Sequence, residues 1–171
     1  MRYAGMMEIT FHPLSSIPAT ELVALLNDPD VARHMPLSGA DWDEAKALNW
    51  ARAKDGQWQE NGYGPWAIRL DGVFAGWGGF QKEEADADLG LVLLPGYWGS
   101  GGAIFREILD RGKELDLPDI TILLPPSRTR MKGLGRLGFV PDGEVEYVGH
   151  RFVKFRLRQG VPGPRPSTGS G

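Results

Sequence analysis

Two patterns of hydrophobic and polar positions run along this chain. Alternating or short apolar runs predict strands at Glu8–His12, Trp66–Leu70, Val73–Phe80, Leu89–Leu94, Ile120–Leu124, Val145–Val148 and Arg151–Leu157. Apolar residues at helical spacing predict helices from Pro18 to Leu26, Asp28 to His34, Asp41 to Gln59 or Glu60, Ile104 to Leu115 and Ser127 to Leu137. Asp71-Gly72, between two of the strands, is a strong hairpin signal. The pattern therefore predicts helices combined with a sheet that contains antiparallel pairs.

The stretch from Leu89 to Leu109 is the centre of this arrangement. Its apolar strand is stopped by Pro95-Gly96, and a helix that carries Ile104 and Ile108 follows. The connection Trp98-Gly99-Ser100-Gly101-Gly102-Ala103 has few side chains, so a ligand can approach its main chain. Free amides at the start of a helix can bind an anion. The stretch therefore predicts a phosphate-binding turn between a strand and a helix.

Two known glycine motifs do not fit this turn. A dinucleotide fingerprint that began at Gly99 would need glycine at position 104, where the chain has Ile104. A P-loop would need Gly-Lys followed by Ser or Thr, and none follows. From these six residues alone, an ordinary tight turn without a ligand is the alternative.

The turn resembles the acetyl-CoA pyrophosphate loop of the GNAT superfamily of N-acetyltransferases, Q/R-x-x-G-x-G/A. Gly101 and Ala103 stand at its two small positions, and Trp98 replaces Gln or Arg. Tyr-Trp-Gly-x-Gly after a strand and a proline looks like the Rim-type branch, which acetylates protein N-termini and related amines. The segment Asp28-Pro29-Asp30-Val31-Ala32-Arg33 also looks like a segment common near the start of Rim-type chains.

A second resemblance lies further along the chain. GNAT chains typically read P-x-N-x-x-S before a helix that ends in L-G-F. Here Pro125, Ser127, Arg130 and Leu137-Gly138-Phe139 occupy that register, with Ser127 in place of Asn and Arg130 in place of Ser. The resemblance covers about residues 8 to 157.

The resemblance implies an α/β (α+β) GNAT fold. Such a fold has a mixed, mostly antiparallel sheet of six to seven strands, helices on both faces and splayed central strands. The main chain of Leu91, Val92, Leu93 and Leu94 is expected to bind the pantetheine and thioester of acetyl-CoA. The phosphates are expected at Trp98, Gly99, Ser100, Gly101, Gly102 and Ala103, with Ser127 and Arg130 as further cofactor contacts. The implied function is direct transfer of acetyl from acetyl-CoA to a primary amine in a ternary complex.

An amine acceptor must lose a proton, because an α-amino group has an unperturbed pKa of about 8. Asp88 is the first candidate for the general base, since Rim-type chains often carry an acid just before the corresponding strand segment. A solvated carboxylate at a strand end is the structural alternative. His34 is the rival base, because imidazole titrates near neutrality. Ser127 and Tyr147 are candidates to protonate the leaving thiolate, and bulk water would also suffice.

The predicted helix from Asp41 places Trp50, Lys54 and Trp58 on one side. Core packing is the favoured interpretation of these tryptophans. The functional alternative is that one of them lines an acceptor pocket, since this region covers the substrate side in the GNAT fold.

Composition narrows the possible partners. Nineteen basic and twenty-two acidic side chains leave a net charge of −3, which predicts neither a nucleic-acid partner nor binding to an anionic membrane. The chain has no cysteine, and its three histidines are far apart in the sequence, so no metal site is expected. We expect a cytoplasmic protein, because no signal peptide and no apolar run of about 20 residues is present.

Several questions stay open at this stage. The acceptor could be a small-molecule amine or a peptide N-terminus, and the chain could instead be a degenerate GNAT module that binds CoA without turnover. An unrelated α/β binding protein is a third interpretation.

We expect one domain at residues 1–158, followed by a disordered tail at 159–171 rich in proline, glycine and serine. An exposed edge of the closing hairpin could pair with a second copy as a homodimer.

Overall fold

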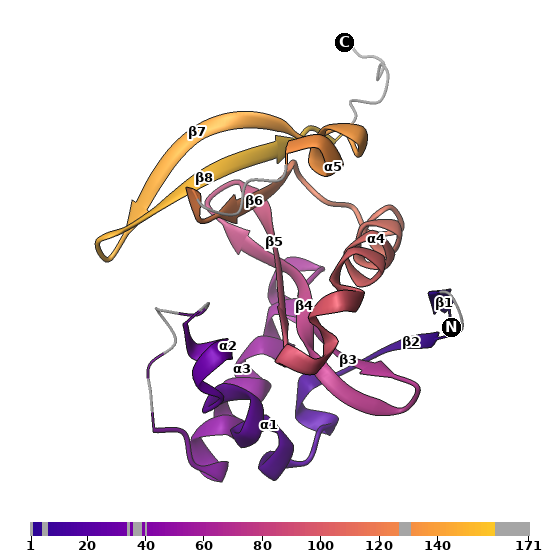
Figure 1. Ribbon diagram of the computed structural model, residues 1–171, viewed down its shortest axis with the longest axis vertical. Coiled ribbons are helices and arrows are strands. Elements are labelled where there is room, and N and C mark those ends of the chain that lie inside the picture. The colour runs from indigo at the N-terminus through magenta and orange to yellow at the C-terminus, as the bar shows by residue number, and fades with distance from the viewer. Residues whose placement is uncertain are drawn as a thin grey trace. The chain divides into compact units, whose positions relative to one another are not determined.

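The computed structural model describes residues 2–4, 7–33, 35, 39, 41–126 and 131–159 (Figure 1). They fall into two compact units, one of Met1–Gln81 with Gly90–Asp116 and one of Lys82–Leu89 with Leu117–Gly171. Hydrogen-bonded strands follow the order β1-β2-β3-β4-β5-β6-β8-β7, and strand β5 (Asp86–Leu93) has residues in both units. Within the described ranges, no helix is both long and apolar enough to cross a membrane.

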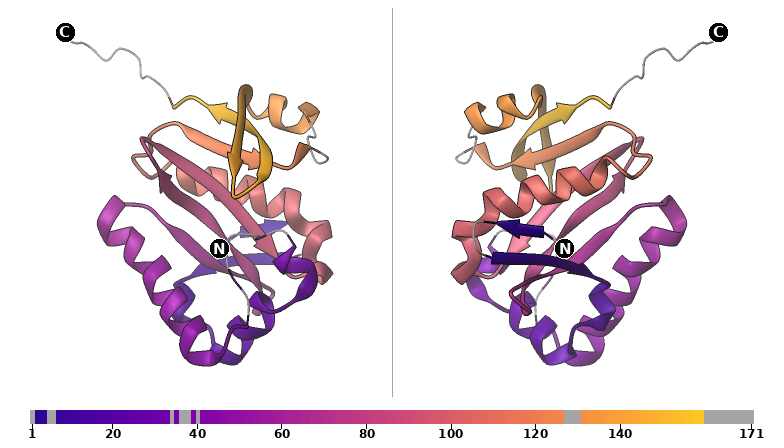
Figure 2. Two further views of the ribbon diagram at one scale, coloured as in Figure 1. Left: turned by 90° about the vertical axis from the view of Figure 1, so that its left-hand side faces the viewer. Right: turned by 90° about the vertical axis from the view of Figure 1, so that its right-hand side faces the viewer.

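The first unit is a sheet with helices on both faces (Figures 1 and 2). Its antiparallel strands are β1 (Arg2–Ala4), β2 (Met7–His12), β3 (Pro65–Leu70) and most of β4 (Val73–Glu83). The helical elements are η1 (Leu14–Ser16), α1 (Ala19–Leu26), α2 (Pro29–Ala32), α3 (Glu44–Asn61), η2 (Pro95–Ser100) and α4 (Gly101–Gly112).

Local sequence signals explain where these elements begin and end. Asp28 accepts hydrogen bonds from the amides of Asp30 and Val31, and so caps α2. Asp43 caps α3 in the same way, and Gly62 ends that helix at a φ of 82°. The predicted helices over this part of the chain and the predicted hairpin at Asp71-Gly72 are therefore confirmed. Helix α3 begins at Glu44 rather than at Asp41, because Asp43 caps it, and it ends at Asn61 rather than at Gln59 or Glu60.

Neighbouring residues of β4 face opposite sides of the sheet. The Trp77 side chain belongs to a core cluster built mainly from η1, α1 and α3, together with Ala67 of β3. A Cβ atom at Gly78 would lie 3.0 Å from Ile108 Cδ1 of α4, so this glycine lets α4 approach the other face. Helices on both faces are what the sequence predicts.

The second unit contains the start of β5, then β6 (Ile120–Leu124), α5 (Met131–Arg136), β7 (Val140–Tyr147) and β8 (His150–Leu157). Strands β5 and β6 are parallel and pair at Ala87 with Ile120 and at Asp88 with Thr121, whereas β8 is antiparallel to both β6 and β7. The predicted closing hairpin is confirmed, as is the end of α5 before Gly138, which has a φ of 99°.

The sheet is thus mixed and mostly antiparallel, as expected. Strand β1, which has three residues, is additional to the six to seven strands that the sequence predicts. The splay of the central strands stays a prediction.

Candidate active site

The phosphate-binding turn predicted after β5 is folded as a 3-10 helix that leads directly into α4. The indole Nε1 of Trp98 donates a hydrogen bond to the Leu93 carbonyl at 2.8 Å, and the Tyr97 amide donates to the Leu94 carbonyl at 2.9 Å. Helix α4 begins at Gly101, so Gly102 and Ala103 lie in its first turn rather than in a loop. These two hydrogen bonds hold the turn to the end of β5.

The glycines of this turn are not explained by the fold. None of Gly99, Gly101 and Gly102 has a positive φ. A Cβ atom added at Gly99 or Gly102 would meet no described atom within 4 Å, and one at Gly101 would meet only Leu93 Cδ1 at 3.9 Å. Neither backbone conformation nor packing therefore requires glycine here. Open main chain is what a ligand needs in order to approach closely.

The N-terminus of α4 is suited to an anion. Within the described part of the chain, the Ser100 side chain makes no capping hydrogen bond and no acidic residue stands in the first turn. The first amides of a helix carry the positive end of its dipole. Among those of α4, the Gly101 amide already donates to the Trp98 carbonyl. Together with the open glycines, these amides fit the pyrophosphate of a CoA thioester.

The strand segment before the turn already uses some of its main-chain groups. The Leu94 amide donates to the Ala75 carbonyl of β4 at 2.8 Å, and the Leu93 carbonyl accepts from Trp98. The Val92 carbonyl lies against Gly76, where a Cβ atom would approach it to 2.0 Å. The Leu94 amide and the Leu93 carbonyl are therefore already hydrogen-bonded within the protein. Binding of acetyl-CoA by the other main-chain groups of Leu91, Val92, Leu93 and Leu94 stays a prediction.

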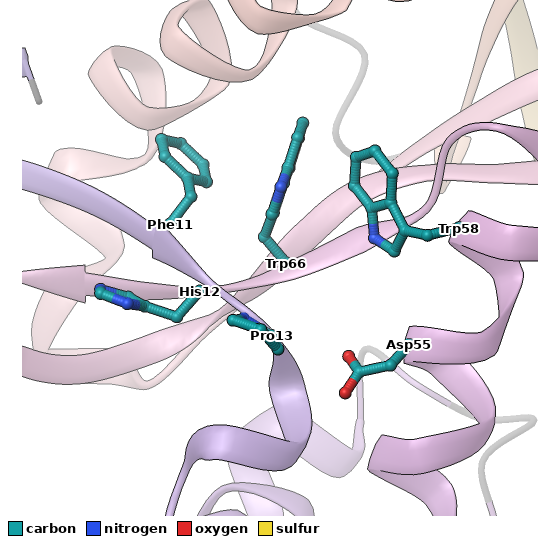
Figure 3. A pocket seen from close by; sticks show the side chains of 6 residues that line it. All are labelled: Phe11, His12, Pro13, Asp55, Trp58 and Trp66. Atoms are coloured by element: carbon teal, nitrogen blue, oxygen red, sulfur yellow. The ribbon is translucent and has the colours of Figure 1, made fainter.

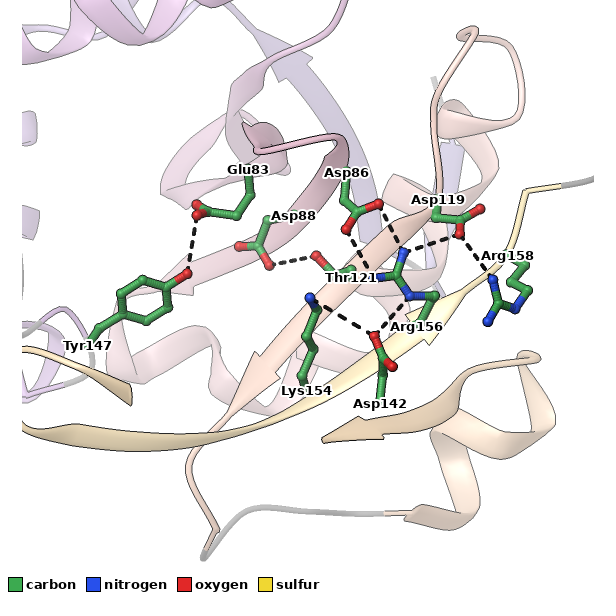
Figure 4. A network of polar contacts seen from close by, with 10 residues as sticks. All are labelled: Glu83, Asp86, Asp88, Asp119, Thr121, Asp142, Tyr147, Lys154, Arg156 and Arg158. Atoms are coloured by element: carbon green, nitrogen blue, oxygen red, sulfur yellow. Dashed lines mark hydrogen bonds and ion pairs between the residues drawn. The ribbon is translucent and has the colours of Figure 1, made fainter. Parts of the chain in front are cut away.

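Asp88 lies near the start of β5 and is half-buried (Figure 4). Because Asp88 pairs with Thr121 in the parallel register, their side chains share one face, and Thr121 Oγ1 donates to Asp88 Oδ1 at 3.2 Å. Burial raises the pKa of Asp88 from its ordinary 3.8 to about 7, the Glu83 carboxylate adds to the rise, and the Thr121 hydrogen bond and Lys154 oppose it. This carboxyl can exchange a proton at neutral pH.

Tyr147, the other candidate in this unit, donates its hydroxyl to Glu83 Oε2 at 3.1 Å (Figure 4). Burial and the Glu83 carboxylate raise the pKa of Tyr147, so the phenol keeps its proton near neutrality. The other carboxylates in Figure 4 hold the unit together, because the Arg156 guanidinium binds Asp86, Asp119 and Asp142. Among the carboxylates of Figure 4, Asp88 and Glu83 are the two that do not pair with Arg156.

Three candidate residues, His34, Ser127 and Arg130, lie outside the described residues. Their predicted roles as rival base, thiolate proton donor and cofactor contacts stay predictions. Within the described ranges, no group of three or more His, Asp or Glu side chains is placed to hold a metal ion.

The tryptophans of α3 separate into two groups. Trp58 packs against Trp66 with ring centroids 4.9 Å apart, whereas Trp50 lies between Trp42 and Trp77 at 6.2 and 5.6 Å. The sequence predicted Trp50, Lys54 and Trp58 on one side of the helix; Lys54 does lie beside Trp50, whereas Trp58 packs against Trp66 instead. The prediction missed Gln57 and Gln81, which hydrogen-bond beside Lys54. Gln57 could have been predicted to lie beside Lys54, because the two are three residues apart on α3. The sequence around Gln81 gives no indication that it joins them.

A hollow of about 360 Å³ lies between β2, β3 and α3, lined by Phe11, His12, Pro13, Asp55, Trp58 and Trp66 (Figure 3). Its polar groups have partners in the fold. Asp55 accepts from the amides of Leu14 and Ser15, and the Trp58 indole donates to the Pro65 carbonyl. Burial, with the charges of Arg69 and Arg111, lowers the pKa of His12. The groups that line this hollow hold η1 and the end of α3 in place.

Known proteins share this architecture. The family model described as an acetyltransferase (GNAT) domain matches residues 8–138. A GNAT-family acetyltransferase from Bordetella pertussis has a TM-score of 0.69 at 19% identity, covering 86% of this chain and 94% of its own. YncA from Salmonella typhimurium, solved with acetyl-CoA, gives 0.63 at 16%, covering 92% and 96%. Mycobacterium smegmatis RimJ, solved with CoA-disulfide, gives 0.65 at 18%, covering 88% and 81%.

The structural likeness at these identities concerns the fold, and the family model covers most of the chain. The matched region includes the start of α4, Asp88 and the Leu137-Gly138 of the L-G-F ending. The chain therefore belongs to the GNAT acetyltransferase family.

Proposed function

We propose that this protein transfers an acetyl group from acetyl-CoA to the primary amine of an acceptor. The observation that carries the proposal is the start of α4. This helix N-terminus has no capping side chain, and the glycines around it are not required by the packing of the fold. Family membership supports it, and so do the acetyl-CoA and CoA-disulfide in the YncA and RimJ structures. Acetyl-CoA supplies the activated acyl group, and the α4 amides bind its pyrophosphate.

Asp88 is the proposed general base. With a pKa of about 7, it is largely ionised at physiological pH and still basic enough to accept a proton from an ammonium group, directly or through water. The Thr121 hydroxyl fixes one of its oxygens. The freed amine attacks the thioester carbon, and the C–S bond breaks as CoA leaves as its thiolate. The nitrogen then releases a second proton as the amide forms, and this balances the proton that the thiolate takes up through water.

Thermal unfolding with and without acetyl-CoA tests the cofactor. A Gly101→Glu variant places a carboxylate at the proposed pyrophosphate site, and Gly56→Glu makes the same change inside α3, where a Cβ atom also meets nothing within 4 Å. Ligand at about 100 times its Kd should stabilise the parent and Gly56→Glu by about 2.7 kcal/mol. The Gly101→Glu variant should lose this gain. A well-folded parent without a shift would remove acetyl-CoA from the function.

Release of CoA thiol across a panel of amines and short peptides tests turnover. Acetylation of at least one amine supports the proposed enzyme and identifies whether the acceptor is a small molecule or a peptide N-terminus. Cofactor binding without acetylation of any acceptor would favour a degenerate module that only binds CoA.

A further inference from the structure

One face of α3 carries polar groups that the fold leaves uncompensated. Trp50, Lys54 and Gln57 follow each other at spacings of four and three residues, so they lie on one stripe of the helix. Trp77 and Gln81 of β4 contact this stripe. All five residues belong to the first unit.

The Lys54 ammonium lies among aromatic rings. It is 5.0 Å from the Trp77 ring centroid and 5.8 Å from that of Trp50, and it donates a hydrogen bond to Gln81 Oε1. Lys54 takes part in none of the ion pairs of the described residues. Burial lowers the pKa of Lys54, which reflects the cost of a cation shielded from water without an anion nearby.

Hydrogen-bonding atoms are also unsatisfied around this lysine. The indole nitrogens of Trp42 and Trp77 and the Oε1 atom of Gln57 are buried and find no hydrogen-bond partner among the described residues. A buried indole N–H usually has a partner. By contrast, Asp55 and Trp58 of the aromatic hollow in Figure 3 are bonded to the backbone. The Lys54 cation and the two indole donors therefore favour acceptor oxygens on a ligand, and the Gln57 Oε1 atom favours a donor group on the same ligand.

This cluster adjoins the strand proposed to bind the thioester. Trp42 and Trp77 belong to the core cluster against which Trp50, Val92 and Leu94 pack. Val92 and Leu94 are part of the segment whose main chain the family resemblance assigns to acetyl-CoA. A molecule bound at Lys54 would therefore contact Trp77, which belongs to the cluster that Val92 and Leu94 of this strand segment pack against.

We propose that Lys54, with Trp50 and Trp77, binds the carboxylate of an acceptor that is an α-amino acid with an apolar side chain. The inference rests on the proposed acetyl transfer. The ammonium pairs with the carboxylate, and the half-buried Trp50 ring offers apolar contact to the side chain. Acceptors that are only polycationic, such as polyamines, would place like charges beside Lys54. In the reaction the ammonium nitrogen loses two protons, gains an N–C bond to the acetyl group and displaces CoA as its thiolate, which takes up one of the two protons.

The test compares phenylalanine with phenylalaninamide as acceptors at saturating acetyl-CoA. The measured quantity is kcat/KM for phenylalanine divided by kcat/KM for phenylalaninamide. The two acceptors differ in amine pKa, and this difference contributes equally to the ratio in the parent and in the variants. In Lys54→Met the ratio should fall roughly tenfold to a hundredfold, because a charge-assisted bond to the carboxylate is lost. Lys54→Arg should retain most of the ratio. Lys113→Met, the same change at an exposed lysine at the end of α4 that pairs with Asp110, should leave it unchanged within about twofold.

An unchanged ratio in Lys54→Met, or a parent that acetylates spermidine or a peptide in preference to phenylalanine, would overturn the inference. A second measurement does not need turnover: N-acetylphenylalanine is titrated while tryptophan fluorescence is recorded. Binding to the parent and Lys113→Met but not to Lys54→Met supports the subsite even where no amine is acetylated, and that result would count against the proposed function alone. If Lys54→Met acetylates both acceptors as the parent does, and N-acetylphenylalanine causes no fluorescence change in the parent, the proposed acetyl transfer would stand and the subsite at Lys54 would be wrong.

Discussion

Replacing Asp88 by Asn should make the protein's stability respond differently to pH. The variant keeps the size of the side chain and an oxygen that can accept from Thr121, but it cannot ionise. In the folded parent the pKa of Asp88 is about 7, against an ordinary value of 3.8. Between these two values the folded state holds a proton that the unfolded state releases.

The sign and the size of the effect follow from this difference. Because the folded state binds more protons, the contribution of Asp88 to the free energy of unfolding falls as pH rises from about 4 to about 7, and is constant above that range. A shift of roughly three pH units corresponds to about 4 kcal/mol as an upper value. The Asn variant should therefore gain stability relative to the parent as pH rises, by up to this amount.

Urea unfolding of parent and variant at pH 5, 6, 7 and 8 measures the difference directly. Asp116→Asn, which removes the same charge at an exposed site, serves as the control. Equal differences between Asp88→Asn and parent at pH 5 and pH 8 would refute the reasoning, since they would mean that Asp88 titrates alike in the folded and unfolded chain.

Three further predictions concern the fold. Gly76→Ala should destabilise the protein by about 3 kcal/mol or more in urea unfolding, because its Cβ atom would approach the Val92 carbonyl oxygen to 2.0 Å; a loss below 1 kcal/mol would contradict the close approach. Asp43→Ala should cost about 1 kcal/mol by the same assay, through the lost cap of α3, and Asp43→Asn should cost less. Arg156→Met should lower the melting temperature by leaving Asp86 and its neighbouring carboxylates without their cation, and added salt should narrow the difference; a difference insensitive to salt would point to lost packing instead.

Much of the fold could be predicted because its signals are local. The Asp71-Gly72 hairpin needs only two residues that accept positive φ, and both adopt it, at 50° and 83°. The caps at Asp28 and Asp43 reach amides two or three residues away. The open turn before α4 could be predicted for the same reason, since its property is the absence of side chains within six consecutive residues.

The chemistry at Asp88 and Lys54 was harder to predict, because it depends on partners far along the chain. Asp88 meets Thr121 only through the parallel register of β5 with β6, 33 positions away. Lys54 meets Gln81 and Trp77 through packing of α3 on β4. An acid before an apolar strand and a lysine between tryptophans are visible in the sequence. Their desolvation, which decides what they can do, follows from tertiary packing.

The burial of Asp88 has opposite consequences for folding and for the proposed proton transfer. Moving a proton from an ammonium group with a pKa of about 8 to a carboxylate at 3.8 is unfavourable by about 6 kcal/mol, whereas moving it to Asp88 at about 7 costs about 1.4 kcal/mol. The difference is close to the free energy by which ionised Asp88 weakens the fold. Since the Thr121 hydroxyl lowers this pKa, Thr121→Val should raise it and move the acid limb of the kcat/KM profile to higher pH. If the limb stayed in place while the stability profile moved, Asp88 would be a buried carboxyl of the fold and the base would be another group.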